Sequence, residues 1–181
     1  MSHDIPEEAK CTADLDCVLL TYSGSYRAQL VRLAACEKGI NWKHYEVNIT
    51  SKLDNLEPWY VNLNPGAYVP TMLVGVENKP ICESAAIINY IDREFKGKTK
   101  LQSCVEADPK LKERYETFEK LHEDWDVEPI SFGGVMENNF MVAQLMPVFR
   151  NNFFDKIEKL KSQQPEGSLF EKLYQKKIYS K

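Results

Sequence analysis

The chain lacks any window of about 20 apolar residues, the length that a membrane-spanning helix needs. Its first residues also lack the basic-then-apolar pattern of a secretory signal. Lys and Arg number 23 against 27 Asp and Glu, and the resulting net charge of −4 gives no basic excess of the kind that binds nucleic acid. We therefore expect a cytoplasmic protein without a nucleic-acid partner.

The sequence has no Cys-x-x-Cys pair and no cysteine spacing typical of a zinc site. Its five cysteines are odd in number and irregularly spaced. They are Cys11, Cys17, Cys36, Cys82 and Cys104. This pattern favours free thiols in a reducing compartment over a disulfide framework, and we expect no bound metal.

The first half of the chain alternates between strand-like and helix-like patterns. The predicted strands are 17–22, 42–47, 71–74 and 79–82, with helices at 26–38 and from 84 to about 95. Ser84 is the expected N-cap of the later helix, and Gly39 is a plausible C-cap of the earlier one. The order of elements predicts a mixed four-stranded sheet with parallel and antiparallel pairs.

Strand signals cease after a short polar segment at 96–104, which reads as a linker. Asp108 and Pro109 form an N-cap and first-turn pair ahead of an amphipathic pattern that runs to Trp125. A second helix runs through Leu145 to Leu160, and Pro147 lies at its start or kinks it.

A capping box from Ser168 to Glu171 opens a short final helix. We therefore predict an α+β domain over residues 1–97 and an all-α domain over 105–181.

Residues 22–95 resemble the N-terminal half of the cytosolic glutathione transferase superfamily. Each motif is weak alone, but their order and spacing together are specific. The motifs are Ser25 ahead of the Arg27–Ala34 helix, Glu57-Pro58-Trp59-Tyr60 with Asn64-Pro65, Val69-Pro70, and Ile81-Cys82-Glu83-Ser84. The segments 57–64 and 81–95 are most similar to the ganglioside-induced differentiation-associated protein type and to a plant dehalogenase-like type.

The resemblance implies a thioredoxin-like fold that holds glutathione as a co-substrate. A transferase must hold the glutathione sulfur as thiolate, which is the nucleophilic form. Ser25 is the expected donor of a hydrogen bond to that sulfur, and Tyr22 is its rival because other classes use a tyrosine at the end of the first strand. The alternative for Ser25 is a helix N-cap and nothing more.

The resemblance also implies a cis peptide bond before Pro70, where the backbone of Val69 would pair with the cysteinyl part of glutathione like an added strand. Glu83 and Ser84 would meet the γ-glutamyl group. Without the resemblance, Pro70 is a trans proline at a strand start, Ser84 is a cap, and Glu83 is a first-turn charge.

Two departures from the family pattern stand out. Many relatives carry a basic residue for the glycyl carboxylate where this chain has Leu56, and Lys52 or Asn55 are the nearby substitutes. The helical half also looks short relative to the family, as in a fragment or a reduced member, so any membrane association would depend on a missing C-terminal segment.

The leading function is therefore glutathione transfer to a small hydrophobic electrophile. A hydrophobic pocket for that substrate competes with an ordinary core as the role of one group of side chains. They are Met136, Phe140, Met141, Met146 and Phe149. A thiol-disulfide oxidoreductase is disfavoured because Ser25 cannot form a mixed disulfide. The alternative function is a non-catalytic binding or dimerisation module with a relict or sensory site, and a homodimer is compatible with either.

Overall fold

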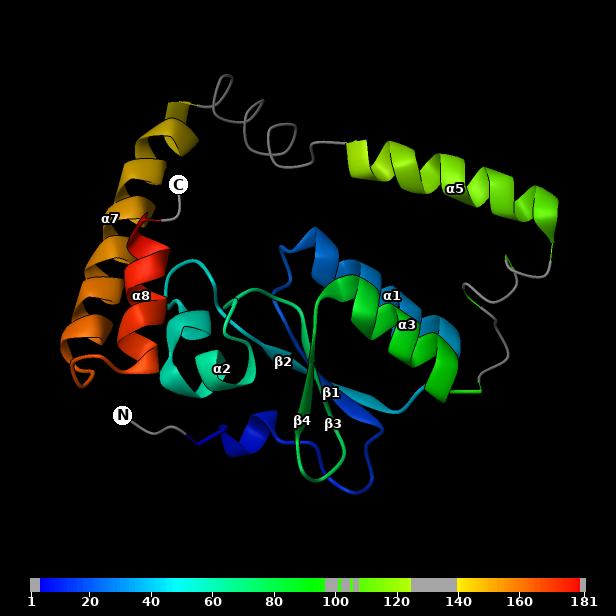
Figure 1. Ribbon diagram of the computed structural model, residues 1–181, viewed down its shortest axis with the longest axis horizontal. Helices are drawn as coiled ribbons and strands as arrows, with labels where there is room; N and C mark the ends of the chain where they lie inside the picture. The colour runs from blue at the N-terminus through cyan, green and yellow to red at the C-terminus, as the bar shows by residue number, and fades with distance from the viewer. Residues whose placement is uncertain (1–3, 97–100, 102–104, 106–107, 125–139, 180–181) are drawn as a thin grey trace.

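A computed structural model describes residues 4–96, 101, 105, 108–124 and 140–179 (Figure 1). Its centre is one four-stranded sheet in the order β2-β1-β3-β4. The strands are β1 (Cys17–Thr21), β2 (Trp42–Glu46), β3 (Thr71–Val74) and β4 (Lys79–Cys82). β1 pairs parallel with β2 and antiparallel with β3, which in turn pairs antiparallel with β4. The predicted mixed sheet is confirmed, with strand ends within one residue of those expected.

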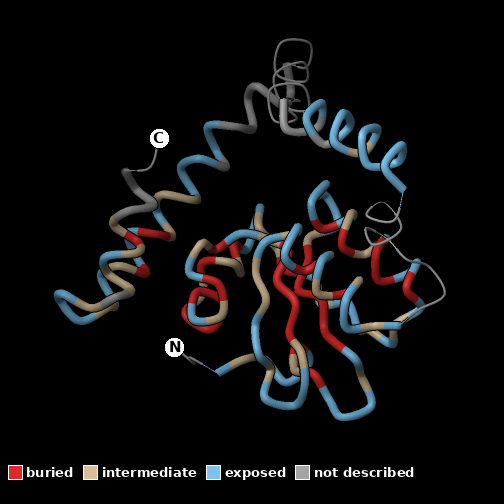
Figure 2. Tube along the Cα trace, turned by 45° about the vertical axis from the view of Figure 1, so that its right-hand side comes forward, coloured by how far each residue is buried: buried red, intermediate tan, exposed pale blue. Residues whose placement is uncertain are grey.

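Both faces of the sheet are covered. Helices α1 (Tyr26–Lys38) and α3 (Ser84–Glu94) pack against one face, where Leu19 and Met72 belong to the buried cluster. The opposite face contributes Val18 and Leu20 to a second cluster, which includes Trp59 and Tyr60 of α2 (Pro58–Leu63). Successive residues of a strand point to opposite faces, so a central strand between two covering layers is buried on both sides. All five residues of β1 are accordingly buried, as the tube in Figure 2 shows for the middle of the sheet.

Local signals set the ends of α1. The Ser25 hydroxyl accepts a hydrogen bond from the Ala28 N–H at 3.3 Å, which is the bond expected of an N-cap. Gly39 closes the helix in the left-handed region with φ of 62°, and its N–H donates to the Cys36 carbonyl. Both predicted caps of this helix are confirmed.

The start of α3 differs from the prediction by one residue. Glu83 is the N-cap and Ser84 is the first helical residue, so the expectation that Ser84 caps the helix is wrong. The physical reason is the short connection, since β4 ends at Cys82 and a single residue makes the turn into the helix.

The long connection between β2 and β3 contains helical turns that the sequence pattern did not predict. They are the 3-10 turn η2 (Asp54–Leu56) and the helix α2 (Pro58–Leu63). A further 3-10 turn, η1 (Glu7–Ala9), lies in the leader before β1. Pro58 stands at the first helical position of α2, where its missing N–H costs nothing. This helix has six residues and is buried from Pro58 to Val61, so it has no polar face to show a helical period.

The second half of the chain is helical where it is described. Its helices are α5 (Pro109–Asp124), α7 (Phe140–Ser162) and α8 (Leu169–Tyr179). Asp108 caps α5 by accepting the Lys110 N–H at 2.9 Å. Pro147 lies inside α7 rather than at its start, while Trp125 falls outside the described residues. None of the helices described is long and apolar enough to cross a membrane.

The predicted capping box of α8 is present in a modified form. The Ser168 hydroxyl accepts the Glu171 N–H at 3.1 Å. The Glu171 carboxylate reaches back to the N–H of Gly167 at 2.6 Å, one residue before the cap. The box therefore ties α8 to the turn that follows α7.

Helices α7 and α8 cover the side of the molecule formed by η2 and α2. Leu56 from η2 lies in one buried cluster with Ile157 of α7 and Tyr174 of α8. The Tyr174 hydroxyl donates to the Leu56 carbonyl at 2.8 Å, and Lys156 forms an ion pair with Glu57 at 2.7 Å. The two halves of the chain thus share a core.

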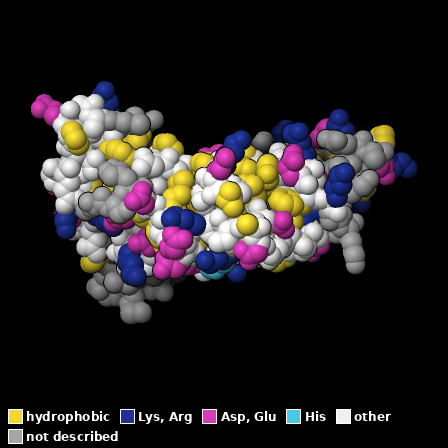
Figure 3. All heavy atoms as spheres, turned by 90° about the horizontal axis from the view of Figure 1, so that it is seen from below, with side chains coloured by type: hydrophobic (Ala, Val, Ile, Leu, Met, Phe, Trp, Pro, Cys, Tyr) yellow, Lys and Arg dark blue, Asp and Glu magenta, His cyan; other side chains and the backbone are white. Residues whose placement is uncertain are grey.

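The face seen in Figure 3 carries charges of both signs with hydrophobic side chains between them. This mixture agrees with the small net charge of −4. No single-sign patch dominates that face.

Candidate functional site

The register of the strands brings four chain segments to one end of the sheet. Leu20, near the end of β1, pairs with Thr71 at the start of β3. Thr71 pairs in turn with Cys82, the last residue of β4. On the other side of β1, Thr21 pairs with Glu46, the last residue of β2. The loops that leave β1, β2 and β4 and the loop that enters β3 therefore meet at this end.

Every predicted site residue lies in one of these loops or at the adjoining helix start. They are Tyr22, Ser25, Val69, Pro70, Glu83 and Ser84. All but the buried Pro70 are at least partly exposed. The N-termini of α1 and α3 also point to this end, and helix N-termini offer free N–H groups and a partial positive charge.

Ser25 has one hydrogen-bonding function in use. As N-cap it accepts the Ala28 N–H through an oxygen lone pair. A hydroxyl also carries one O–H donor. The cap is therefore compatible with a hydrogen bond from the same hydroxyl to an anionic group above the helix.

Tyr22 lies directly after β1 and is half-buried. Its ring packs against the backbone of the next turn, because a Cβ built on Gly24 would lie 2.7 Å from the Tyr22 Cε1 atom. Any side chain at position 24 would have to displace the ring. Tyr22 thus helps to shape the turn that precedes Ser25.

The peptide bond between Val69 and Pro70 is cis, as predicted. Buried polar side chains hold the carbonyl of Tyr68, which precedes Val69. The Tyr60 hydroxyl donates to the Tyr68 carbonyl at 2.7 Å, and the Asn64 amide donates to the same carbonyl at 3.0 Å. Thr71 contacts both the Tyr60 hydroxyl and the Asn64 amide at 3.0 Å. Burial raises the pKa of Tyr60 above its ordinary value, so the phenol stays protonated as a donor.

Removing the Tyr60 hydroxyl should weaken this buried network. We expect Tyr60→Phe to lower the free energy of unfolding by about 1–2 kcal/mol, because it removes a buried donor while keeping the ring. Chemical denaturation measures the change. Tyr45→Phe is the matched control, since Tyr45 is half-buried and has an edge-on contact with Trp59 that the ring alone supplies. Equal losses in the two variants would contradict the network.

Glu83 has an unusual backbone. Its φ of 70° and ψ of 124° lie where residues with a side chain are rare, and such positions cost about 1–3 kcal/mol and cluster at ligand-binding sites. Its carboxylate is exposed and makes no cap hydrogen bond to α3. Ser84 follows as a half-buried residue in the first turn of the helix.

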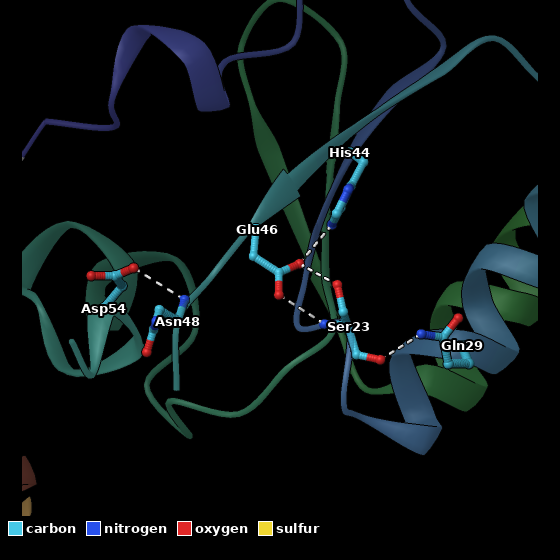
Figure 4. A network of polar contacts seen from close by, with 6 residues as sticks. All are labelled: Ser23, Gln29, His44, Glu46, Asn48 and Asp54. Atoms are coloured by element: carbon cyan, nitrogen blue, oxygen red, sulfur yellow. Dashed lines mark hydrogen bonds and ion pairs between the residues drawn. The ribbon is translucent and has the colours of Figure 1, made fainter. Parts of the chain in front are cut away.

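Sequence reasoning missed a polar network around Ser23 (Figure 4). The Glu46 carboxylate accepts the Ser23 N–H at 3.0 Å and the Ser23 hydroxyl at 2.9 Å. The Gln29 side chain donates to the Ser23 carbonyl at 2.7 Å. His44 contacts Glu46 at 3.0 Å. The strand alternation placed His44 and Glu46 on one face, but nothing in the sequence connected them to a turn 23 residues away.

The order of groups in this network differs from that of a hydrolytic triad. In such a triad a histidine lies between the hydroxyl and the acid. Here Ser23 and His44 both contact the same Glu46 oxygen, so the acid lies in the middle. Partial burial raises the pKa of Glu46, but the hydrogen bonds from Ser23 and the contact with His44 outweigh it and hold the pKa below its ordinary value. Glu46 therefore acts as an ionised acceptor.

Leu56 has a structural role. It is completely buried, and its carbonyl accepts the Tyr174 hydroxyl. Of the two substitutes considered for the missing basic residue, Asn55 donates its amide to the Ala67 carbonyl at 2.8 Å, whereas Lys52 is exposed. The Asn55 amide is thus engaged within the fold, whereas the Lys52 ammonium lies at the surface.

The described cysteines are free thiols, and they are Cys11, Cys17, Cys36 and Cys82. Burial raises the pKa of Cys17 to about 12 and also raises that of Cys82, which donates to the Leu63 carbonyl. A raised pKa lowers the thiolate fraction, so neither is an activated nucleophile. Within the described part of the chain no cluster of side chains could hold a metal ion.

The hydrophobic side chains considered for a second-substrate pocket lie outside the side chains that the structure describes. They are Met136, Phe140, Met141, Met146 and Phe149.

Comparison with known proteins agrees with this geometry. Residues 24–94 match the family model of the glutathione S-transferase N-terminal domain. This segment is similar to the glutathione S-transferase N-terminal domain. The predicted resemblance and the glutathione-transferase-like fold are thereby confirmed.

Two curated relatives, one human and one from a plant, are similar to part of the chain. The chain is 32% identical over 80 residues to human "Ganglioside-induced differentiation-associated protein 1-like 1", covering 44% of this chain and 21% of that protein. It is 34% identical over 85 residues to "Glutathione S-transferase 3" of Glycine max, covering 46% and 36% respectively. The chain thus spans between about a fifth and a third of the length of these relatives.

Solved structures similar to the chain include "Ure2p in Complex with Glutathione", with a TM-score of 0.44, 21% identity, and coverage of 47% of this chain and 38% of that one. A theta class glutathione S-transferase of Xanthomonas axonopodis pv. citri with glutathione bound has a TM-score of 0.40 at 26% identity, covering 45% and 38%.

Proposed function

We propose that the protein is a glutathione transferase that binds glutathione at the end of the sheet and holds its sulfur as thiolate beside Ser25. The observation that carries the proposal is the convergence of a capping serine, whose O–H remains available, with two helix N-termini at one end of a glutathione S-transferase domain. A small hydrophobic electrophile is the second substrate.

The chemistry follows from the groups at this end. The thiol proton leaves to solvent, and the Ser25 hydroxyl donates to the resulting thiolate, which the N-terminus of α1 also favours. The sulfur electron pair then forms a bond to the electrophilic carbon, and the displaced group departs with the bonding electrons or the electrophile takes up a proton.

The rest of glutathione would be held by backbone and charge. Neither backbone group of Val69 has a hydrogen-bond partner among the described residues, so both are available to the cysteinyl part of the ligand. The N-terminus of α3 at Ser84 suits the γ-glutamyl carboxylate, and the exposed Glu83 carboxylate suits the amine. Lys52 is our candidate for the glycyl carboxylate.

Calorimetric titration with glutathione and a turnover assay together test the proposal. We expect the wild type to bind, and we expect Ser25→Ala to lower kcat by about 10²-fold, because it removes one preorganised donor to a developing anion. Tyr22→Phe is the matched variant, since it removes the hydroxyl of the rival residue. Loss of turnover in Tyr22→Phe with retention in Ser25→Ala would move the assignment to Tyr22. Absence of binding heat when the folded wild type is titrated with glutathione would contradict the proposed transferase.

A non-catalytic binding or dimerisation module is the second candidate. It is favoured by one observation, the burial of Leu56 where many relatives carry a basic residue. Such a module would fail to turn over an aryl halide with glutathione although it is folded.

Our proposal extends to the organisation of the whole protein. It comprises a glutathione-binding domain over 1–97, a helical domain over 105–181, a cytoplasmic location and a homodimer.

A further inference from the structure

The turn between β1 and α1 is held from outside by two side chains. Glu46 binds the Ser23 N–H and hydroxyl with its two carboxylate oxygens, and Gln29 binds the Ser23 carbonyl (Figure 4). All the polar groups of Ser23 therefore have partners, two residues before Ser25. Within the turn, the Ser25 N–H donates to the Tyr22 carbonyl at 2.9 Å.

The position of Glu46 is itself fixed by the sheet. Thr21 pairs with Glu46 in the register, and the Thr21 carbonyl accepts the Val47 N–H at 2.7 Å. We call the two bonds from Ser23 to the Glu46 carboxylate the clamp. The backbone of Glu46 and the end of β1 before the turn are both part of the β1–β2 ladder. Among the described residues, the Glu46 carboxylate links this ladder to the side chain and N–H of Ser23 in the turn.

We propose that Glu46 is a positioning residue that sets the place of the Ser25 hydroxyl, and hence the thiolate fraction of glutathione bound beside it. This role rests on the proposed function. Glu46 would not touch the substrate, and it would act through Ser23 and the turn.

The negative charge of Glu46 allows a positioning effect to be distinguished from a direct electrostatic effect on the sulfur. A carboxylate near a thiolate disfavours the thiolate by like-charge repulsion. If Glu46 acted on the sulfur only through its charge, its removal would raise the thiolate fraction. If it acts by positioning, its removal lowers that fraction, so the two effects have opposite signs.

The first measurement is amide hydrogen exchange of Ser23, Ser25 and Ala28 in the ligand-free protein. We expect Glu46→Ala to speed exchange at Ser23 and Ser25 by about tenfold, because the turn loses its clamp. Glu46→Gln keeps an oxygen that accepts the Ser23 N–H, so exchange should stay near the wild-type rate. Unchanged exchange in Glu46→Ala would overturn the proposal.

The second measurement is the ultraviolet absorbance of the thiolate of bound glutathione at pH 7, together with turnover. We expect Glu46→Ala to lower the thiolate fraction several-fold, by less than the loss expected of Ser25→Ala, because the hydroxyl is displaced rather than removed. Glu46→Gln should match or exceed the wild type, because it keeps the shape and removes the charge. Glu37→Ala, an exposed carboxylate in the last turn of α1, is the control.

A double variant separates positioning from general damage. In the Ser25→Ala background, Glu46→Ala should cause no further loss of thiolate, since the hydroxyl that it positions is gone. An equal loss in both backgrounds, or a gain of thiolate in Glu46→Ala alone, would overturn the role. If the wild type binds no glutathione, the proposed function falls and this role with it, whereas binding with unchanged thiolate in Glu46→Ala removes this role alone.

Discussion

Replacement of Lys38 by methionine should lower the free energy of unfolding by about 3–5 kcal/mol, because it breaks a buried ion pair and leaves a carboxylate in the interior. Lys38 Nζ lies 2.6 Å from Asp92 Oδ1, and the two side chains are only 3% and 6% exposed. The same ammonium donates to the Asp92 carbonyl at 3.0 Å, and Leu101 N–H donates to the carboxylate. The pair therefore joins the end of α1 to the end of α3 and to the chain beyond it.

Denaturation by urea measures this effect. Lys112→Met is the matched control, because Lys112 pairs with Glu116 at 3.9 Å on the surface of α5 with both side chains 62% exposed. Exposed pairs contribute little, so this variant should unfold near the wild-type midpoint. The double variant Lys38→Met/Asp92→Leu should recover part of the loss, since it removes the buried charge as well. Equal stability of Lys38→Met and Lys112→Met would refute the argument.

The second large effect is expected at position 56. Resemblance to the family suggests that Leu56→Lys would restore the missing cation and tighten glutathione binding. The structure predicts the opposite outcome, because Leu56 is completely buried in a cluster with Ile157 and Tyr174. An ammonium at that site would lose its hydration, which costs several kcal/mol. We expect Leu56→Lys to unfold the protein or to lower its stability by at least about 3 kcal/mol.

Leu33→Lys is the matched control for this change. Leu33 lies on α1 and is 58% exposed, so the same substitution places the charge in water. Circular dichroism during denaturation should show a large loss of stability only at position 56. A stable Leu56→Lys that binds glutathione more tightly would contradict the burial of this position and return it to the ligand site.

The elements that were predicted correctly depend on contacts close in sequence. Helix α1 begins at a serine cap and ends at a left-handed glycine, and both signals lie within four residues of the groups they bind. The four strands were predicted because their apolar runs are bounded by turns. The capping serine was a candidate site residue for the same reason, since a cap and a ligand-binding hydroxyl favour the same place at the start of a helix.

The features that the sequence did not predict depend on distant partners. Leu56 bonds through its carbonyl to Tyr174, 118 residues away, and no local pattern shows which side of η2 a later helix will cover. The clamp of Glu46 on Ser23 joins segments 23 residues apart through a strand register. Glu83 was predicted in the first turn of the helix, but it is the N-cap of α3. Its backbone conformation follows from the short connection after β4 and not from its residue type, so the sequence did not show it.

The shared core between η2, α2 and the last two helices has a practical consequence for anyone dissecting the protein. A fragment cut after residue 97 would expose the apolar side chains that α7 and α8 now cover. They are Leu53, Leu56, Val61 and Ala67. Such a fragment would present a newly exposed apolar surface that favours aggregation, so its behaviour in a binding assay would say little about the intact chain.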